Sequence, residues 1–396
     1  MLAMKKILFI WNYFYLESEK GESRFAYLAN LLVEKGYELE VVTSSFYHMK
    51  KVHRHIPKKE LDSLPYKLTF IDEPGYKKNI SFKRLRSIKI FNKGVEKYLC
   101  SLKVNPDLIY VPVPSTKTGS IAVKYCKANN IPLVIDIEDL WPESFEMILR
   151  SRFLTKLIFW PWIVKANKLY KSVDGIIAVS NSYLDRALKV RSDKPISAVS
   201  YIGSNFERAA TIRKDLSIKP KDEIWLTYIG TIGKSYNLKL FIDLMDNLEK
   251  DGFHNFRLKI LGDGPDKEKV MKYADSKIGK VEFLGLLPYE EMIKILKVSD
   301  YGINPIDKHS VASIINKVAD YASVGLPVIN TQRCEEYANI LKETHSGISF
   351  FTEDFYDIEE FLLNNSADNF SKETINIFSR KLNYENIINV IKELTK

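Results

Sequence analysis

Short apolar runs alternate with longer helical patterns along this chain of 396 residues. Continuous apolar runs are typical of strands buried on both faces of a parallel sheet, with helices covering those faces. The runs form two sets, "KILFIW", "LEVVTS", "DLIYV", "PLVIDI" and "GIIAVS", then "IWLTYIG", "FRLKILG", "VEFLG", "YGINPI" and "PVINT". The pattern predicts the α/β class, with two doubly wound Rossmann-like domains that face a central cleft.

The stretch "VSYIGSNFERAA" separates the two sets and is the predicted linker. We place an N-terminal Rossmann-like domain at residues 1–205 and a second at residues 206–375. A chain of this length is long for a single core, which favours two domains. Residues 376–396 form a predicted helix that either finishes the second domain or crosses back to the first.

The net charge of +9 is unevenly distributed. Residues 1–200 contain 33 Lys and Arg against 20 Asp and Glu, a net of +13, and the remainder contains 26 against 30, a net of −4. The first half is therefore expected to meet an anionic partner.

Basic residues alternate with aromatic and aliphatic ones in residues 76–98 and again in residues 149–171. Such patterns occur where proteins meet membrane surfaces or nucleic acids, and the structural alternative is a solvated helix face. Because no nucleic-acid motif is present, we favour the membrane surface over nucleic acid. No run approaches the roughly 20 apolar residues that span a bilayer. Three scattered cysteines predict a reducing cytoplasm.

Two glycine turns follow predicted strands of the second half. "GTIGKS", residues 230–235, has the Gly-Lys-Ser of a P-loop, but the required earlier glycine is Tyr228, which excludes an ATPase of that type. The turn either holds an anion on its backbone N–H groups beside Lys234 or is only structural. "GDGPDK", residues 262–267, is common turn chemistry and is weak evidence alone.

Three carboxylates, Asp136, Glu138 and Asp139, follow a predicted buried strand. Carboxylates crowded there are costly unless a cleft solvates them or donors hold them. Helix capping accounts for Asp139, with Pro142 in the first turn. The other two are candidates for an acceptor-side or catalytic role. The histidine-rich stretch "HMKKVHRH" is also lysine-rich, which disfavours a metal site there.

Lys317 and Asp320 lie three positions apart in a predicted helix that Gly325 and Pro327 end. Residues at this spacing share a helix face. Two interpretations compete: a surface ion pair worth a few tenths of a kcal/mol, about 0.2–0.5, or a ligand site at the mouth of the sheet.

Four segments of the second half resemble, in order and spacing, the donor domain of family 4 glycosyltransferases, which have the GT-B fold. They are "LTYIGTIGKSYNLKLFIDLM", "LKILGDGPDKEKV", "VEFLGLLPYEEMIKILKVSDYGINPI" and "SIINKVADYASVGLPVIN". The motif "EDLWPES", which contains Asp-Leu-Trp-Pro-Glu, is similar to one in the acceptor domain of a subgroup that makes bacterial cell-surface polysaccharides. Some members of that subgroup resemble amino-sugar transferases acting on polyprenyl-linked acceptors.

The resemblance implies that Lys317 contacts the donor diphosphate and that Asp320 stands where the family usually has a glutamate on the ribose hydroxyls. The segments around Gly262 and after Gly285 resemble those that shape the nucleotide-base pocket. The implied donor-binding residues are Gly233, Lys234, Gly262, Asp263, Gly264, Pro288, Asn316, Lys317 and Asp320.

In the first half "EKGESRF" resembles the glycine loop that approaches the phosphates, which implies Gly21, Ser23 and Arg24 in the cleft. The implied catalytic residues are Glu138, Asp136 and Asp139. Two cations and several N–H groups can stabilise a departing diphosphate without a metal, so neither a metal nor a cofactor is expected.

Three positions depart from the family pattern. Ala312 replaces a glutamate that commonly contacts the transferred sugar, Tyr236 stands where a glycine or Lys-Gly is usual, and Glu138 takes the place of a histidine.

The sequence therefore predicts a retaining glycosyltransferase, hexosyltransferase-like and metal-independent. It would move a sugar from a nucleotide-sugar, UDP-linked by family habit, to a lipid-linked or polysaccharide acceptor. Bacterial capsule, O-antigen or exopolysaccharide synthesis is the expected setting, with the protein cytoplasmic and peripherally attached to the inner face of the plasma membrane. The alternatives are a nucleotide-sugar hydrolase or epimerase of the same fold, and a catalytically silent binding subunit.

Overall fold

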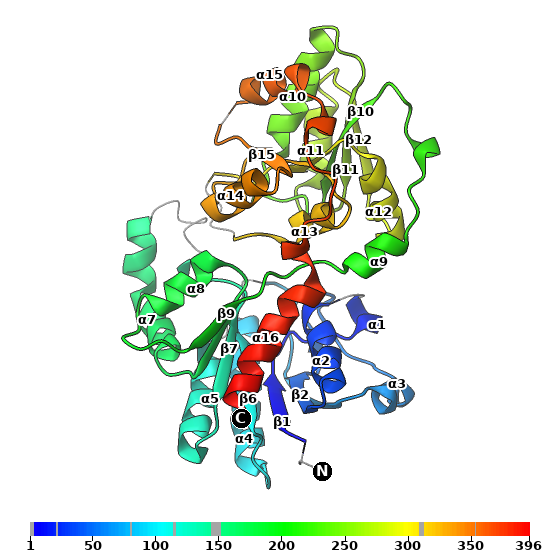
Figure 1. Cartoon of the computed structure of the whole chain (residues 1–396). Helices are drawn as coiled ribbons and strands as arrows, with labels where there is room; N and C mark the ends of the chain where they lie inside the picture. The colour runs from blue at the N-terminus through cyan, green and yellow to red at the C-terminus, as the bar shows by residue number, and fades with distance from the viewer. Residues whose placement is uncertain are drawn as a thin grey trace. The chain divides into compact units, whose positions relative to one another are not determined.

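The computed structural model describes residues 4–20, 23–79, 81–113, 116–143, 152–308, 313–352 and 354–396. The described residues divide into two compact units (Figure 1). Unit 1 comprises the residues up to Glu143, Phe153–Ser200 and Tyr384–Lys396, and unit 2 comprises Tyr201–Asn383. Gly21, Ser144 and Ala312 lie outside the described residues.

Unit 1 is built on a seven-stranded sheet whose neighbouring strands are all parallel. The inner strands are buried along almost their whole length, as the apolar runs predict, whereas the two outermost strands are only half-buried. In spatial order the strands are β5 (Lys67–Ile71), β2 (Glu38–Ser44), β1 (Lys6–Ile10), β6 (Leu108–Val113), β7 (Leu133–Ile137), β8 (Gly175–Ala178) and β9 (Ile196–Val199).

Helices connect these strands, and a short antiparallel hairpin follows β2. The hairpin strands are β3 (Phe46–Tyr47) and β4 (Val52–His53). The helices are α1 (Glu17–Lys20), α2 (Arg24–Glu34), α3 (Lys58–Ser63), α4 (Phe82–Ser101), α5 (Thr116–Asn129), α7 (Arg152–Tyr170) and α8 (Asn181–Leu188).

The helix α16 (Arg380–Leu394) belongs to unit 1 from Tyr384 onward. Tyr384 is fully buried and packs edge-to-face on Tyr27 of α2, with 5.3 Å between the ring centroids. Ile387 and Ile391 lie in the same hydrophobic core as β1. Residues distant in sequence therefore complete the core of unit 1, and the helix expected over residues 376–396 begins at Arg380.

Unit 2 repeats the architecture with a six-stranded parallel sheet. Its strands in spatial order are β12 (Val281–Gly285), β11 (Phe256–Leu261), β10 (Ile224–Ile229), β13 (Tyr301–Asn304), β14 (Val328–Asn330) and β15 (Gly347–Ser349). Its α-helices are α9 (Phe206–Thr211), α10 (Leu238–Lys250), α11 (Lys267–Ala274), α12 (Tyr289–Val298), α13 (Asn316–Ser323), α14 (Glu335–Glu343) and α15 (Tyr356–Asn364). The 3₁₀ helices are η2 (Leu216–Ile218), η3 (Ala367–Asn369) and η4 (Asn376–Phe378).

Part of the predicted linker packs within unit 2. Ser204 N–H donates to Phe378 O at 3.0 Å, and Arg380 N–H donates to Ser204 O at 3.0 Å. A Cβ on Gly203 would lie 2.8 Å from the Arg380 Cα, so a glycine is needed at this close approach. The chain consequently passes from unit 1 to unit 2 after Ser200, earlier than the boundary placed at residue 205.

A second close approach, between two turns of unit 2, predicts the effect of one substitution. A Cβ on Gly262 would lie 1.8 Å from the Gly230 carbonyl oxygen, so Gly262→Ala must displace backbone. We expect a loss of about 2–4 kcal/mol in the free energy of unfolding. Urea denaturation measures it, with Gly233→Ala as control, since a Cβ there meets its nearest neighbour at 3.8 Å. Equal effects of the two substitutions would contradict this account.

Candidate functional site

Two glycine turns join at the carboxyl edge of the unit 2 sheet. Gly230 N–H donates to Leu261 O at 2.8 Å, and Ile232 N–H donates to Asp263 O at 2.9 Å. Gly262 N–H donates in turn to Gly285 O at 2.7 Å, which ties the end of β12 to the same assembly. The turns after β10 and β11 therefore form one interlocked backbone surface at the edge where open α/β sheets bind ligands.

Lys317, on the first turn of α13, reaches this surface. A Cβ on Gly230 would lie 3.7 Å from Lys317 Nζ, which places the ammonium group directly beside the turn. The residue is only 6% exposed, and its Nζ has no hydrogen-bond partner among the residues that the structure describes. Burial lowers its pKa well below the ordinary lysine range. A buried amine without an acceptor is costly, so its presence needs an explanation.

The Lys317 ammonium group packs against two tyrosine rings. Its Nζ lies 3.6 Å from the ring centroid of Tyr228 and 4.0 Å from that of Tyr236. The Tyr228 hydroxyl donates to Thr231 O at 2.5 Å, which fixes that ring beneath the turn. The π faces offset part of the desolvation of the ammonium group. Sequence reasoning noted Tyr228 and Tyr236 only as departures from glycine patterns; an aromatic residue at both positions is the signal that would have found this contact.

Asp320 does not pair with Lys317, because Lys317 Nζ has no partner. The surface ion pair considered from the sequence is therefore wrong. Asp320 is half-buried and accepts a hydrogen bond from Ser204 Oγ at 2.6 Å. Asn316, the first residue of α13, is exposed.

The remaining residues predicted to bind the donor lie in the segments that follow β10, β11 and β12. They differ in exposure and in their hydrogen bonds. Lys234 is exposed beside the first turn, and Gly233 is half-buried. Asp263 is exposed and accepts from Gly264 N–H at 2.9 Å, which stabilises its own turn. Pro288 is exposed and precedes the first residue of α12.

An amide network that sequence reasoning missed lies at the ends of β13 and β14. Asn304 Nδ2 donates to Asn330 Oδ1 at 2.8 Å and to Gln332 Oε1 at 3.1 Å. Gln332 Nε2 donates to Ser313 O at 2.9 Å, which anchors the segment just before α13. Buried amides in two neighbouring apolar strands, "YGIN" and "PVIN", were the available signal.

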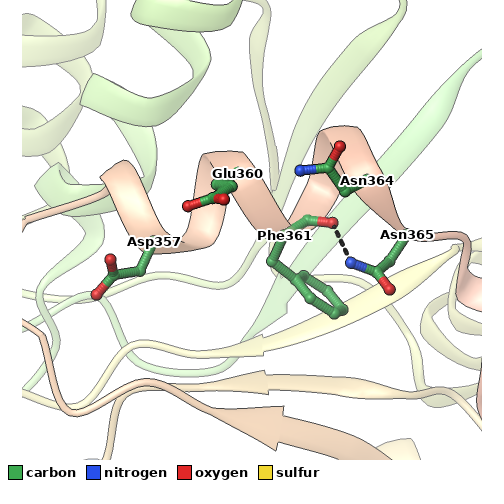
Figure 2. Close-up of a pocket in the computed structure, with 5 residues that line it drawn as sticks. All are labelled: Asp357, Glu360, Phe361, Asn364 and Asn365. Carbon is green, nitrogen blue, oxygen red and sulfur yellow. Dashed lines mark hydrogen bonds between the residues drawn. The ribbon is translucent and has the colours of Figure 1, made fainter.

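A pocket of about 350 Å³ lies elsewhere in unit 2, on α15 (Figure 2). Its lining contains Asp357, Glu360 and Asn364, together with Phe361, whose carbonyl oxygen accepts from Asn365 Nδ2 at 3.0 Å. The lining carries two carboxylates and no cation, so it does not suit a diphosphate.

In unit 1, Arg24 and Asp136 form a buried ion pair in which one guanidinium nitrogen contacts both carboxylate oxygens. Arg24 Nη2 donates to the two Asp136 oxygens at 2.9 and 2.7 Å, and the Tyr110 hydroxyl donates to Oδ2 at 2.6 Å. Asp136 is 0% exposed. The Asp136 carboxylate is therefore stabilised by hydrogen-bond donors and not by solvent in a cleft. The Asp136 charge raises the pKa of Arg24 despite burial.

This geometry corrects two expectations. Asp136 has no surface that an acceptor can reach, and Arg24 is committed to it rather than presented to phosphate. Ser23 caps α2, since its Oγ accepts from Ala26 N–H at 3.2 Å and donates to Tyr15 O at 3.1 Å. Gly21 lies outside the described residues.

Glu138 and Asp139 remain half-buried beyond the end of β7. Glu138 Oε1 lies 3.8 Å from Arg24 Nε. Burial raises the pKa of Asp139, and the nearby Glu143 adds to that effect. Glu138 is thus the carboxylate that combines partial exposure with a neighbouring cation.

Residues 223–364 match the family model described as Glycosyl transferases group 1. Most of unit 2 is therefore similar to a glycosyltransferase group 1 domain. An uncharacterized glycosyltransferase of Methanocaldococcus jannaschii is 28% identical over 160 residues, 39% of this chain. The matched part spans 41% of that relative's length.

Two solved structures resemble this chain over both of its units. HepE of Anabaena in complex with UDP-glucose is 11% identical, with 98% of each chain covered and a TM-score of 0.60. A Listeria monocytogenes structure described as a UDP-N-acetylglucosamine 2-epimerase is 14% identical, with 99% of this chain and 96% of the other covered and a TM-score of 0.60. These likenesses confirm the predicted fold of two Rossmann-like units, GT-B.

The buried Lys317 of unit 2 generates a pH-dependent prediction. Its pKa is lowered on folding, so the unfolded chain binds the extra proton below pH 10.5, and the native state loses stability there. Lys317→Met removes this cost and should stabilise the protein by about 1–3 kcal/mol at neutral pH. The gain should shrink as the pH approaches 10.5.

Urea denaturation at several pH values measures this gain. Lys272→Met, at an exposed position of α11, is the matched control and should show no such trend. A destabilising Lys317→Met at neutral pH would contradict the reasoning.

Proposed function

We propose that this protein is a glycosyltransferase that moves a sugar from a UDP-linked donor to a lipid-linked or polysaccharide acceptor. The observation that carries the proposal is Lys317, a buried amine without a partner beside two interlocked glycine turns. A diphosphate would supply the negative counter-charge that the Lys317 ammonium group lacks. HepE, which shares the fold, is described in complex with UDP-glucose, and this supports UDP as the nucleotide.

Unit 2 would bind the donor. The N–H groups around Gly233, with Lys317 and Lys234, face the diphosphate, and Asp320 accepts from the ribose hydroxyls. When the bond between the anomeric carbon and the diphosphate oxygen breaks, its electron pair stays on the diphosphate. Lys317 and Lys234 stabilise that negative charge, which is why we propose a metal-independent reaction.

The acceptor hydroxyl would form the new bond to the anomeric carbon and pass its proton to an oxygen of the departing diphosphate. We propose that Glu138 orients this hydroxyl, because it is a half-buried carboxylate after β7 with the Arg24 guanidinium 3.8 Å away. Asp136 then acts as a positioning residue that holds Arg24, and Asp139 follows Glu138 in the same loop. Retention of anomeric configuration and a role in bacterial capsule, O-antigen or exopolysaccharide synthesis follow from the resemblance to family 4 and are part of the proposal.

Membrane attachment would come through α7. Phe153, Leu157 and Trp160 of this helix are 74%, 64% and 63% exposed. Residues 152–171 contain five basic residues and no acidic one. None of the described helices has the length and apolar character needed to cross a membrane. A basic, aromatic and exposed helix fits the surface of an anionic bilayer, where a lipid-linked acceptor resides.

An epimerase or hydrolase is the second candidate, since the Listeria structure described as an epimerase has the same fold. It would act on the nucleotide-sugar without an acceptor. A catalytically silent binding subunit is the third candidate, because Ala312 replaces a glutamate that commonly contacts the transferred sugar in the family. Turnover of UDP-sugars by the purified chain, with and without a prenyl-linked acceptor, separates the three.

Nucleotide binding tests the donor site. Calorimetry should show UDP binding that Lys317→Ala and Asp320→Ala each weaken by about 10–100-fold. Each substitution removes a hydrogen bond that involves a charged group, and such a bond contributes about 1.5–3 kcal/mol. Lys272→Ala should leave the affinity unchanged, because Lys272 is exposed on α11. GDP is measured in parallel. If UDP and GDP both fail to bind, the donor site does not exist.

Vesicle sedimentation tests the membrane surface. Wild-type protein should bind vesicles of equal parts phosphatidylglycerol and phosphatidylcholine. The double substitution Leu157→Gln and Trp160→Gln should reduce partitioning about tenfold or more, through lost apolar burial. Leu216→Gln removes a side chain that is 70% exposed in unit 2 and serves as control. Undiminished binding by the double variant would eliminate α7 as the attachment surface.

A further inference from the structure

A second group of charged and polar side chains gathers in unit 1, outside the residues discussed so far. Tyr13 follows β1, His48 and Lys51 lie in the hairpin after β2, Tyr76 follows β5, and Arg84 is on the first turn of α4. Because β5, β2 and β1 are neighbours in a parallel sheet, the segments after them meet at its carboxyl edge. We call these five residues the Tyr76 cluster.

The members of the Tyr76 cluster contact one another closely. Tyr76 Oη lies 2.5 Å from His48 Nδ1, and Lys51 Nζ lies 3.0 Å from the same nitrogen. Arg84 Nη2 donates to the Tyr13 hydroxyl at 3.3 Å. The Arg84 and Lys51 cations lie 5.7 and 5.2 Å from the Tyr76 ring centroid. Two cations thus lie close to the ring of one buried tyrosine.

The cluster carries positive charge without a compensating acid. Among the described residues, neither Lys51 nor Arg84 forms an ion pair with a carboxylate, and Arg84 Nε is buried without a hydrogen-bond partner. Glu73, whose charge reaches Tyr76, is buried and accepts from the hydroxyls of Ser44 and Ser87. Burial and the two cations lower the pKa of His48 to about 4, so its ring is neutral near pH 7.

Two like charges held together at a sheet edge repel each other unless an anion joins them. An arginine fork, a lysine and two phenolic hydroxyls supply donors suited to the several oxygens of a phosphate group. We propose that the Tyr76 cluster binds the diphosphate of a prenyl-linked acceptor. This assignment of the ligand rests on the proposed function, whereas the presence of an anion site rests on the cluster alone.

The anion site is tested in a protein whose donor site is disabled. Calorimetry with inorganic pyrophosphate is carried out on Lys317→Ala protein, alone and combined with Arg84→Gln or Lys51→Gln. Each added substitution should weaken pyrophosphate binding at least tenfold. Lys93→Gln removes the same charge from an exposed position of α4 and should change nothing. Pyrophosphate binding that is insensitive to Arg84→Gln and Lys51→Gln, or absent altogether, would overturn the proposal.

Separate controls test whether the variants are folded and whether pyrophosphate binds at the Tyr76 cluster. Thermal melts establish that each variant is folded, and Arg84→Lys, which keeps the charge, should retain binding between that of wild type and Arg84→Gln. The assigned His48 imidazole signal in NMR titrations provides a local readout. Its pKa should rise when pyrophosphate binds, because an anion offsets the repulsion from Lys51 and Arg84. An unmoved His48 signal at saturating pyrophosphate would place the anion elsewhere.

The source of the anion is distinguished with geranyl diphosphate. Binding at least as tight as that of pyrophosphate, lost in Arg84→Gln, supports a prenyl-linked ligand, and binding of pyrophosphate only overturns that assignment. UDP affinity of Arg84→Gln in an otherwise wild-type chain should equal that of wild type. Failure of UDP to bind any variant would count against the proposed function, while the pyrophosphate result would still decide the unit 1 site.

Discussion

A parallel sheet covered on both faces confines polar chemistry to one place, the edge where its strands end. Both units obey this constraint. In unit 2 the edge collects two glycine turns and Lys317, and in unit 1 it collects the Arg24–Asp136 pair, Glu138 and the Tyr76 cluster. The strands themselves are nearly all apolar in their inner positions, so their order in the sheet decides which loops meet. The chemistry of the chain is therefore a consequence of strand order.

The two units manage buried cations in opposite ways. Arg24 is paired within the protein with the Asp136 carboxylate through its Nη2, although its Nε is buried without a hydrogen-bond partner among the described residues. Lys317 rests on the Tyr228 and Tyr236 rings, which leave its Nζ without a hydrogen-bond acceptor. A site that fully satisfied its lysine would have less to gain from an incoming diphosphate. The incomplete compensation of Lys317 is thus the observation on which the proposed donor site rests.

The sequence predicted the inner strands and the outermost strand β12, but not the other three outermost strands. β1, β6 and β10 are buried on both faces and appear as continuous apolar runs. The edge strands β5, β9 and β15 are half-exposed, and their mixed composition carries no such signal. Lys317 was found through its motif, whereas its tyrosine support was not, because cation–π contacts join residues that have no fixed spacing. The burial of Asp136 depended on Arg24 and Tyr110, two residues on other elements that pattern alone could not pair with it.

The division of α16 between the units has a consequence for biosynthesis. Tyr384, Ile387 and Ile391 complete the core around β1. They are translated after all of unit 2, so a nascent unit 1 must wait with part of its apolar surface uncovered. No segment of unit 1 interrupts residues Tyr201–Asn383 of unit 2, so this part can fold as soon as it is translated, before unit 1 is complete. An N-terminal fragment ending near residue 200 would lack this closing helix, which makes the two units interdependent in assembly although each has its own sheet.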